Sequence, residues 1–241
     1  MKKALVKVWK GLGKPLRKQI TRFNYNFSAG IPFRDIRKYA MGNFKRAYYN
    51  IVDGGSANGG TILGWKKYFP YSYVYGFEPI KNTEIKQVEN SFLDVKVFHL
   101  ALGDKEETKK FNVNEYTDTS SFYDNKATKK TYNTKKIIDV KLITLDKWCE
   151  INSVEVHILK LDLQGYELNA LKGAKYQLKN NIRCILVESS FKEIYVNQPL
   201  FCDINNFLKK YGFTLHKLYG AEKEKLGFVD CLFVKDGKYE S

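Results

Sequence analysis

From residue 48 onward, short apolar runs typical of β-strands alternate with segments of helical periodicity, and this alternation limits the fold more than any other feature. The strand-like runs are 48–53, 71–78, 95–100, 154–162, 182–188, 213–219 and 227–235. The helix-like segments are 61–69, 80–91, 166–179 and 201–212. Such an order predicts an α/β fold with a doubly wound, mostly parallel seven-stranded sheet. The short link between the last two strands predicts an antiparallel hairpin at one edge.

Two segments interrupt this order. Residues 101–142 are polar and rich in Lys and Thr, with strand-like stretches near 109–113 and 136–142. We predict that they form an insertion carrying a hairpin and a long loop. Residues 1–47 precede the first strand and are predicted to be a basic N-terminal arm or cap, which leaves 48–241 as the main domain.

The positive charge of the chain is concentrated in the arm. The net charge is +15, and residues 1–50 alone carry 13 Lys and Arg against one acid, whereas the remaining 191 residues carry 28 basic and 25 acidic side chains. Residues 1–18 place apolar side chains at helical spacing between lysines, a pattern typical of helices that lie on anionic membrane surfaces. The alternative is a cap helix that packs Trp9 on the main domain. A nearly neutral main domain does not favour a nucleic acid as partner.

The apolar runs and the cysteines indicate in which cellular compartment the protein is expected. No apolar stretch approaches the roughly 18 residues of a membrane span. The apolar run between Lys3 and Lys7 is too short for a signal peptide. The four cysteines show no CxxC spacing, which favours free thiols in a reducing compartment over a zinc site. We expect a cytoplasmic protein, which the basic arm could hold at the inner membrane face.

The stretch NIVDGGSANGGTIL, residues 50–63, places four glycines directly behind the first strand. Ligands of open α/β sheets bind beyond the carboxyl ends of strands, and an acid ending the second strand, here Glu78, can accept hydrogen bonds from both hydroxyls of a ribose. Neither GxGxxG nor GxxxxGK[ST] is present, and Asp53 would repel a pyrophosphate beside it. A nucleoside with a cationic group, such as S-adenosylmethionine, suits both acids. The alternative is an ordinary loop in which Asp53 caps a turn.

Four stretches carry a resemblance to a known family. They are DGGSANGGTI (53–62), YVYGFEP (73–79), HLALGD (99–104) and ILKLDLQGYELNALKGA (158–174), and they resemble the FkbM family of class I, Rossmann-like methyltransferases dependent on S-adenosylmethionine. The resemblance covers about residues 48–218. It implies O-methylation of a saccharide, glycolipid or related glycan. It also implies cofactor-binding roles for Asp53, Gly55, Ser56, Asn58, Gly59 and Glu78, with Ala101, Leu102 and Asp104 near the adenine.

A hydroxyl acceptor needs a general base or a metal to take its proton during methyl transfer. Asp162, which ends a predicted strand, is our first candidate for this catalytic role, followed by Glu188 at the end of the next strand and by Glu167. The alternatives are structural: Asp162 can hold the turn behind it, and Glu167 can favour a helix dipole. These three carboxylates could also hold a divalent metal, but we do not predict one.

Two other functions stay open on the sequence alone. An RNA methyltransferase would use the basic arm to bind phosphates. A non-catalytic adaptor at a membrane surface would use the arm alone. Because Asp53, Glu78 and Asp162 are all present, the sequence favours an enzyme over the adaptor.

Overall fold

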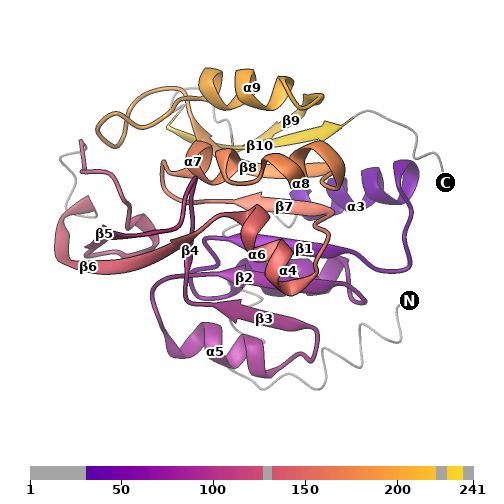
Figure 1. Ribbon diagram of the computed structural model, residues 1–241, viewed down its shortest axis with the longest axis horizontal. Coiled ribbons are helices and arrows are strands. Elements are labelled where there is room, and N and C mark those ends of the chain that lie inside the picture. The colour runs from indigo at the N-terminus through magenta and orange to yellow at the C-terminus, as the bar shows by residue number, and fades with distance from the viewer. Residues whose placement is uncertain (1–30, 127–131, 221–226, 236–241) are drawn as a thin grey trace.

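The computed structural model describes residues 31–126, 132–220 and 227–235, and there the predicted strands form one sheet (Figure 1). Its order is β3-β2-β1-β7-β8-β10-β9. The strands are β1 (Asn50–Gly54), β2 (Tyr73–Phe77), β3 (Val95–Phe98), β7 (Ile158–Leu161), β8 (Cys184–Ser190), β9 (Phe213–Tyr219) and β10 (Phe228–Lys235). The first five run parallel, whereas β10 is antiparallel to both β8 and β9. The predicted doubly wound sheet and its antiparallel edge are confirmed.

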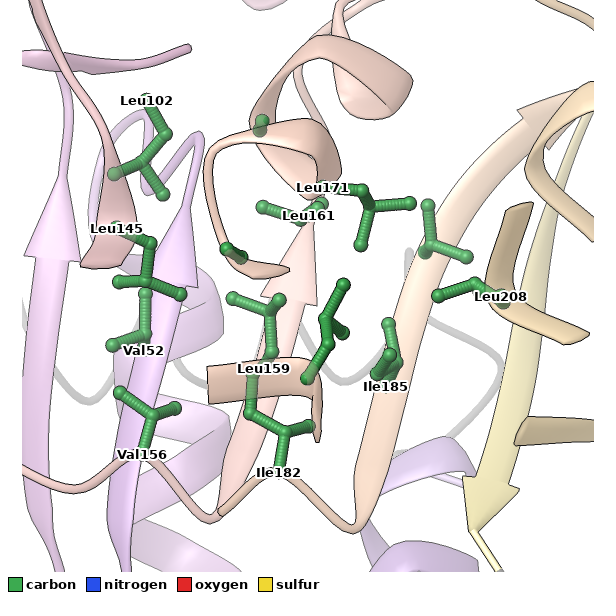
Figure 2. Packing of buried hydrophobic residues seen from close by; sticks show 14 of the residues in the cluster. Val52, Leu102, Leu145, Val156, Leu159, Leu161, Leu171, Ile182, Ile185 and Leu208 are labelled. Carbon is green, nitrogen blue, oxygen red and sulfur yellow. The ribbon is translucent and has the colours of Figure 1, made fainter. Parts of the chain in front are cut away.

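Helices cover both faces of this sheet. One face carries α3 (Ile31–Asn43), α4 (Gly60–Tyr68) and α5 (Thr83–Asn90), and the other carries α6 (Leu145–Asn152), α7 (Glu167–Lys172), α8 (Lys175–Asn180) and α9 (Phe201–Lys209). Successive side chains of a strand point to opposite faces. Ile51 and Ile158 therefore belong to the core under α3–α5, while Val52 and Leu159 pack with α6–α9 (Figure 2).

Helix α3 lies within the segment that the sequence assigns to the arm. Its side chains Phe33, Ile36 and Ala40 are buried in the core, and the ring of Phe33 meets that of Trp65 edge-on at 4.5 Å. The predicted boundary at residue 47 therefore does not coincide with an edge of the packed structure. Basic residues on the outer side of α3 make it resemble the preceding arm in composition. The amphipathic helix predicted for residues 1–18 lies outside the described residues.

The predicted insertion forms a second, smaller sheet. Strands β4 (Ala101–Leu102), β6 (Thr134–Ile143) and β5 (Glu107–Asn114) pair in that order, with β5 and β6 antiparallel. This confirms the predicted hairpin, which extends beyond the main sheet in Figure 1. The short helix η2 (Thr117–Thr119) follows β5. Helix η2 lies at the same end of the main sheet as the glycine-rich turn, although the two segments are far apart in the sequence.

Two local predictions differ from the structure. The single helix predicted over 166–179 is two helices, α7 and α8, separated at Gly173 and Ala174. Position 173 requires glycine, because a Cβ there would lie 1.9 Å from the carbonyl oxygen of Gly103. Helix α6 is absent from the predicted elements, although Thr144 caps it by accepting from the amide of Lys147. Among the described helices, none has the length and hydropathy needed to cross a bilayer.

Candidate functional site

The turn that follows β1 is held between the carboxyl ends of β2 and β7. Gly55 has a φ of +74°, and a Cβ atom there would lie 1.8 Å from the carbonyl oxygen of Asp162. The amides of Gly55 and Ser56 both donate to the carbonyl oxygen of Phe77, at 2.9 and 3.2 Å. Glycine is the residue that tolerates both this conformation and this approach. The main chain of two neighbouring strands therefore fixes the position of the turn.

The same turn delivers the start of α4 to the site. Gly59 has a φ of +83° and its amide donates to the carbonyl oxygen of Ser56 at 2.7 Å. Asn58 Oδ1 accepts from the amide of Gly60 at 3.0 Å. The first residues of α4, Gly60 and Thr61, line a cavity. The partial positive charge of a helix N-terminus favours an anionic group at that place.

Glu78 follows β2 directly and closes the other side of the turn. It is 8% exposed, its Oε2 accepts from the amide of Ala57 at 2.9 Å and its Oε1 from the amide of Ile80 at 2.9 Å. Burial raises the pKa of Glu78 to about 7, although the two backbone amides lower it. Each carboxylate oxygen keeps a further lone pair that can accept a hydrogen bond from a ligand hydroxyl.

A buried ion pair lies beneath the turn. Lys160 on β7 is 2% exposed, and its Nζ lies 3.4 Å from Oδ1 of the fully buried Asp53. The same Nζ donates to the carbonyl oxygens of Gly54 and Gly55, at 3.3 and 3.0 Å. Burial raises the pKa of Asp53, and Lys160 opposes that rise. Burial alone would lower the pKa of Lys160, but the surrounding carboxylates outweigh it and raise that pKa. Lys160 therefore stays charged and ties the turn to β7.

A cavity of about 700 Å³ lies over the turn, within the size range of small-molecule sites. Its turn wall, as we call it, consists of Gly55, Ser56, Ala57, Asn58, Gly60, Thr61, Phe77 and Glu78. Its hairpin wall comes from the insertion and from the turn after β7, and consists of Phe111, Thr117, Asp118, Ser120, Phe122, Asp162, Leu163, Gln164 and Tyr166. Two sheets of different construction thus share one cavity.

The three candidate catalytic carboxylates lie at different depths. Asp162 lines the cavity. Glu167 is 3% exposed, and its Oε1 accepts from the amides of Leu163 and Gly165 at 2.7 and 3.2 Å, so it holds the turn after β7. Burial raises the pKa of Glu167 to about 7. Burial, together with the neighbouring charge of Asp162, also raises the pKa of Glu188. Within the described residues, no group of three or more His, Cys, Asp or Glu side chains is placed to hold a metal ion.

The structure separates the predicted cofactor-binding residues into two groups. Those that line the cavity are Gly55, Ser56, Asn58, Glu78, Ala101 and Leu102. Asp53 is buried behind the turn, and Lys160 is its partner in an ion pair. Gly59 packs against Val88, and Asp104 is exposed beyond β4. Direct contacts of Asp53, Gly59 and Asp104 with a cofactor therefore remain predictions.

Sequence reasoning missed several residues of the site. Lys160 interrupts the apolar run of β7, and a lysine in a fully buried strand is rare unless it is paired, so the sequence carried that signal. Asp118 carries no comparable signal, and Gln164 and Tyr166 carry none beyond their place in the stretch ILKLDLQGYELNALKGA. Their place in the cavity follows from the packing of the hairpin over the end of β7.

The FkbM methyltransferase domain matches residues 53–215 of this chain. The chain belongs to the FkbM methyltransferase family. A FkbM methyltransferase from Methylobacillus flagellatus KT has a similar structure, with a TM-score of 0.52 and 14% identity over 79% of this chain and 45% of that one. The present FkbM chain thus spans less than half the length of that protein.

Other solved structures resemble this FkbM chain more distantly. Magnesium protoporphyrin IX methyltransferase from Synechocystis PCC 6803 has a TM-score of 0.47 and 13% identity, covering 96% of this chain and 91% of its own. Fibrillarin from Aeropyrum pernix has a TM-score of 0.45 and 10% identity, covering 79% and 67%. No curated protein sequence matches the chain. At these identities the structural similarity concerns the fold alone.

Proposed function

We propose that this chain is a methyltransferase that uses S-adenosylmethionine to methylate a hydroxyl of a saccharide, glycolipid or related glycan. The observation that carries the proposal is the juxtaposition of the Gly55 turn with Glu78 at the ends of two adjacent parallel strands. Membership in the FkbM methyltransferase family supports the reaction type.

The residues of the turn wall fit this cofactor. S-adenosylmethionine carries a ribose, a carboxylate and two cationic groups. Glu78 offers acceptors for the ribose hydroxyls, and the N-terminus of α4 suits the carboxylate. Phe77 of the turn wall, with Ala101 and Leu102 beside it in the cavity lining, supplies apolar surface for the adenine ring. When bound, the cofactor supplies a methyl group on a sulfonium, which is a good leaving group.

The charge of the cavity supports an uncharged acceptor. The described residues that line the cavity include one cationic side chain, Lys160, and four acidic ones, which are Glu78, Glu84, Asp118 and Asp162. Lys160 is already engaged with Asp53 and with two carbonyl oxygens. An acidic lining attracts a cation and repels a polyphosphate. It therefore favours a neutral glycan over RNA, even though the whole chain is basic.

The chain's own part in the reaction is to align the reactants and to accept a proton. Asp162, on the hairpin wall, takes the hydroxyl proton of the acceptor in this proposal. The side chains of Phe111, Phe122 and Tyr166 form an aromatic group, with ring centroids 4.8 Å apart for the first pair and 4.7 Å for the second. Such a surface excludes water and offers an apolar face to a sugar ring.

Two measurements test the proposal. Calorimetry with S-adenosylmethionine should show binding to the wild type and at least tenfold weaker binding to Glu78→Ala, while Glu106→Gln on the exposed surface should bind like the wild type. Incubation with methyl-labelled cofactor and separated glycan, lipid and RNA fractions should then place label in a glycan-bearing fraction. Label found in RNA would overturn the acceptor assignment, and absence of binding would overturn the cofactor assignment.

A further inference from the structure

Gln164 stands in a backbone conformation that its own side chain does not favour. It follows Asp162 in the turn between β7 and α7 and has a φ of +52°, in the left-handed region. A residue other than glycine keeps such a conformation only where its surroundings hold it, and such residues concentrate at functional sites. The surroundings of Gln164 are therefore informative.

The side-chain amide of Gln164 joins two carboxylates. Its Nε2 donates to Oδ1 of Asp162 at 2.8 Å and to Oε2 of Glu188 at 2.8 Å. An amide nitrogen has two hydrogens, so both are used. The carboxylate of Asp162 accepts hydrogen bonds, which requires that the nitrogen and not the oxygen of the amide faces it. The orientation of the amide is thus set by the chemistry of its neighbours.

Tyr195 fixes the opposite side of the amide. The residue is fully buried, and its hydroxyl oxygen lies 2.9 Å from Oε1 of Gln164 and 2.8 Å from the carbonyl oxygen of Thr119. The hydroxyl has one hydrogen, which it donates to one of these two acceptors at a time. Thr119 ends η2, next to residues of the hairpin wall. Tyr195 therefore connects that wall to the amide that holds Asp162.

We propose that Gln164 is a positioning residue that holds the carboxylate of Asp162 in one orientation toward the cavity, and that Tyr195 orients the Gln164 amide. The inference rests on the proposed function, in which Asp162 is the base. In that reaction the acceptor oxygen forms a bond to the methyl carbon and the carbon–sulfur bond breaks, with its electron pair staying on sulfur. The hydroxyl proton passes to Asp162. Gln164 acts on this step only through its hydrogen bond to the Asp162 carboxylate.

The direct test is structural and needs neither cofactor nor acceptor. Gln164→Met keeps a side chain of similar length but removes both N–H donors, and Gln87→Met on the exposed face of α5 is the matched control. Crystal structures should show the Asp162 side chain in a new or mixed rotamer in Gln164→Met and unchanged in Gln87→Met. An unchanged Asp162 rotamer in Gln164→Met would overturn the inference. If that variant does not fold, the wild type decides: the Gln164 side-chain amide protons should exchange slowly with solvent, and fast exchange would overturn the inference.

The kinetic test separates positioning from a merely structural role. Once methyl transfer to an acceptor fraction is established, Gln164→Met should lower kcat by about 10- to 100-fold, while KM for the acceptor and Kd for the cofactor stay within about twofold. Tyr195→Phe should lower kcat by about 3- to 10-fold, and Tyr176→Phe on the exposed surface should not change it. Equal losses in kcat and in cofactor affinity would overturn the inference. Failure of the wild type to bind cofactor would instead overturn the proposed function and leave the rotamer result standing.

Discussion

The two walls of the cavity are built in different ways. The turn wall follows the carboxyl ends of β1 and β2, and its position is set by main-chain contacts such as those of Gly55 with Phe77 and Asp162. The hairpin wall comes from the separate three-stranded sheet with η2 and from the turn after β7. Main chain held by a parallel sheet leaves little freedom, whereas side chains on an insertion can change without altering the sheet.

This difference suggests a division of labour between the walls. The turn wall combines bare backbone with buried charge, so a change there should disturb both folding and cofactor binding. The hairpin wall should govern the acceptor and leave folding and the cofactor nearly untouched. If the walls divide the work in this way, the cost of a substitution to the fold should fall from the turn wall to the hairpin wall.

Replacing Gly55 by alanine should be the most damaging change. The new Cβ would lie 1.8 Å from the carbonyl oxygen of Asp162, and the φ of +74° is unfavourable for alanine. We expect a loss of about 4 kcal/mol or more in the free energy of unfolding, measured by urea denaturation, together with loss of cofactor binding. Gly42→Ala is the matched control, because nothing lies within 4 Å of a Cβ there. A Gly55→Ala protein as stable as Gly42→Ala would contradict the rigid turn.

Removing Lys160 should come next, with a cost that depends on pH. In Lys160→Met the fully buried Asp53 has lost its cation, so burial raises the pKa of Asp53 without opposition. An acid whose pKa is raised by folding stabilises the fold only while it is protonated, and that stability is lost as the pH rises through the folded-state pKa. We expect a loss of about 3 kcal/mol at pH 8 and a smaller loss at pH 5.

The second substitution in this pair sharpens the result. Asp53→Asn in the Lys160→Met background removes the buried acid, so the pH dependence of the loss should become smaller. A remainder is expected from Glu78 and Glu188, because Lys160 lowers their pKa values as well. Thermal denaturation at pH 5 and pH 8 measures both variants. If Lys160→Met lost equal stability at the two pH values, the ion pair would not be what holds the turn to β7.

The fold was largely predictable because its strands alternate visibly with helices. β1, β2 and β8 lie close to their predicted runs, and the antiparallel edge follows from two adjacent strands with a short link. The close approach of Gly173 to the carbonyl of Gly103 was not predictable, because the two residues lie some 70 positions apart in sequence. Local periodicity carries no information about such a contact.

The site was predictable only on its turn wall. Glu78 follows from its place at a strand end, since topology brings neighbouring strand ends together. The hairpin wall depends on how β5 and η2 pack over the end of β7, and the polar sequence of residues 101–142 gives no sign of that packing. Gln164 lies in the stretch ILKLDLQGYELNALKGA, but its hydrogen-bond partners Glu188 and Tyr195 come from distant segments of the sequence.

The affinity for S-adenosylmethionine should fall about tenfold between pH 8 and pH 6. The pKa of Glu78 is about 7, because burial raises it, and only the ionised carboxylate is a full acceptor for both ribose hydroxyls. Calorimetric titrations at the two pH values measure the change. In Glu78→Gln the affinity for the cofactor should be lower than that of the wild type at pH 8. The difference in pH dependence between the two proteins reports Glu78 alone, because the ligand's own amine titrates in both experiments. A parallel pH response in both proteins would remove Glu78 from the ribose site.

The smallest effect on the fold is expected from the hairpin wall, where Asp118→Asn is the sharpest probe. Asp118 as a whole residue is exposed on η2, but its carboxyl group is partly desolvated, and this desolvation together with the charge of Asp162 raises its pKa. Losing an exposed charge should change the free energy of unfolding by less than about 0.5 kcal/mol. Cofactor affinity should also stay within about twofold, because the charge of Asp118 affects the pKa of Glu78 less than burial and the two backbone hydrogen bonds do. Methyl transfer to the acceptor, measured with labelled cofactor, is where a change should appear. If Asp118→Asn weakened the cofactor as strongly as Glu78→Gln, the two walls would form one undivided site.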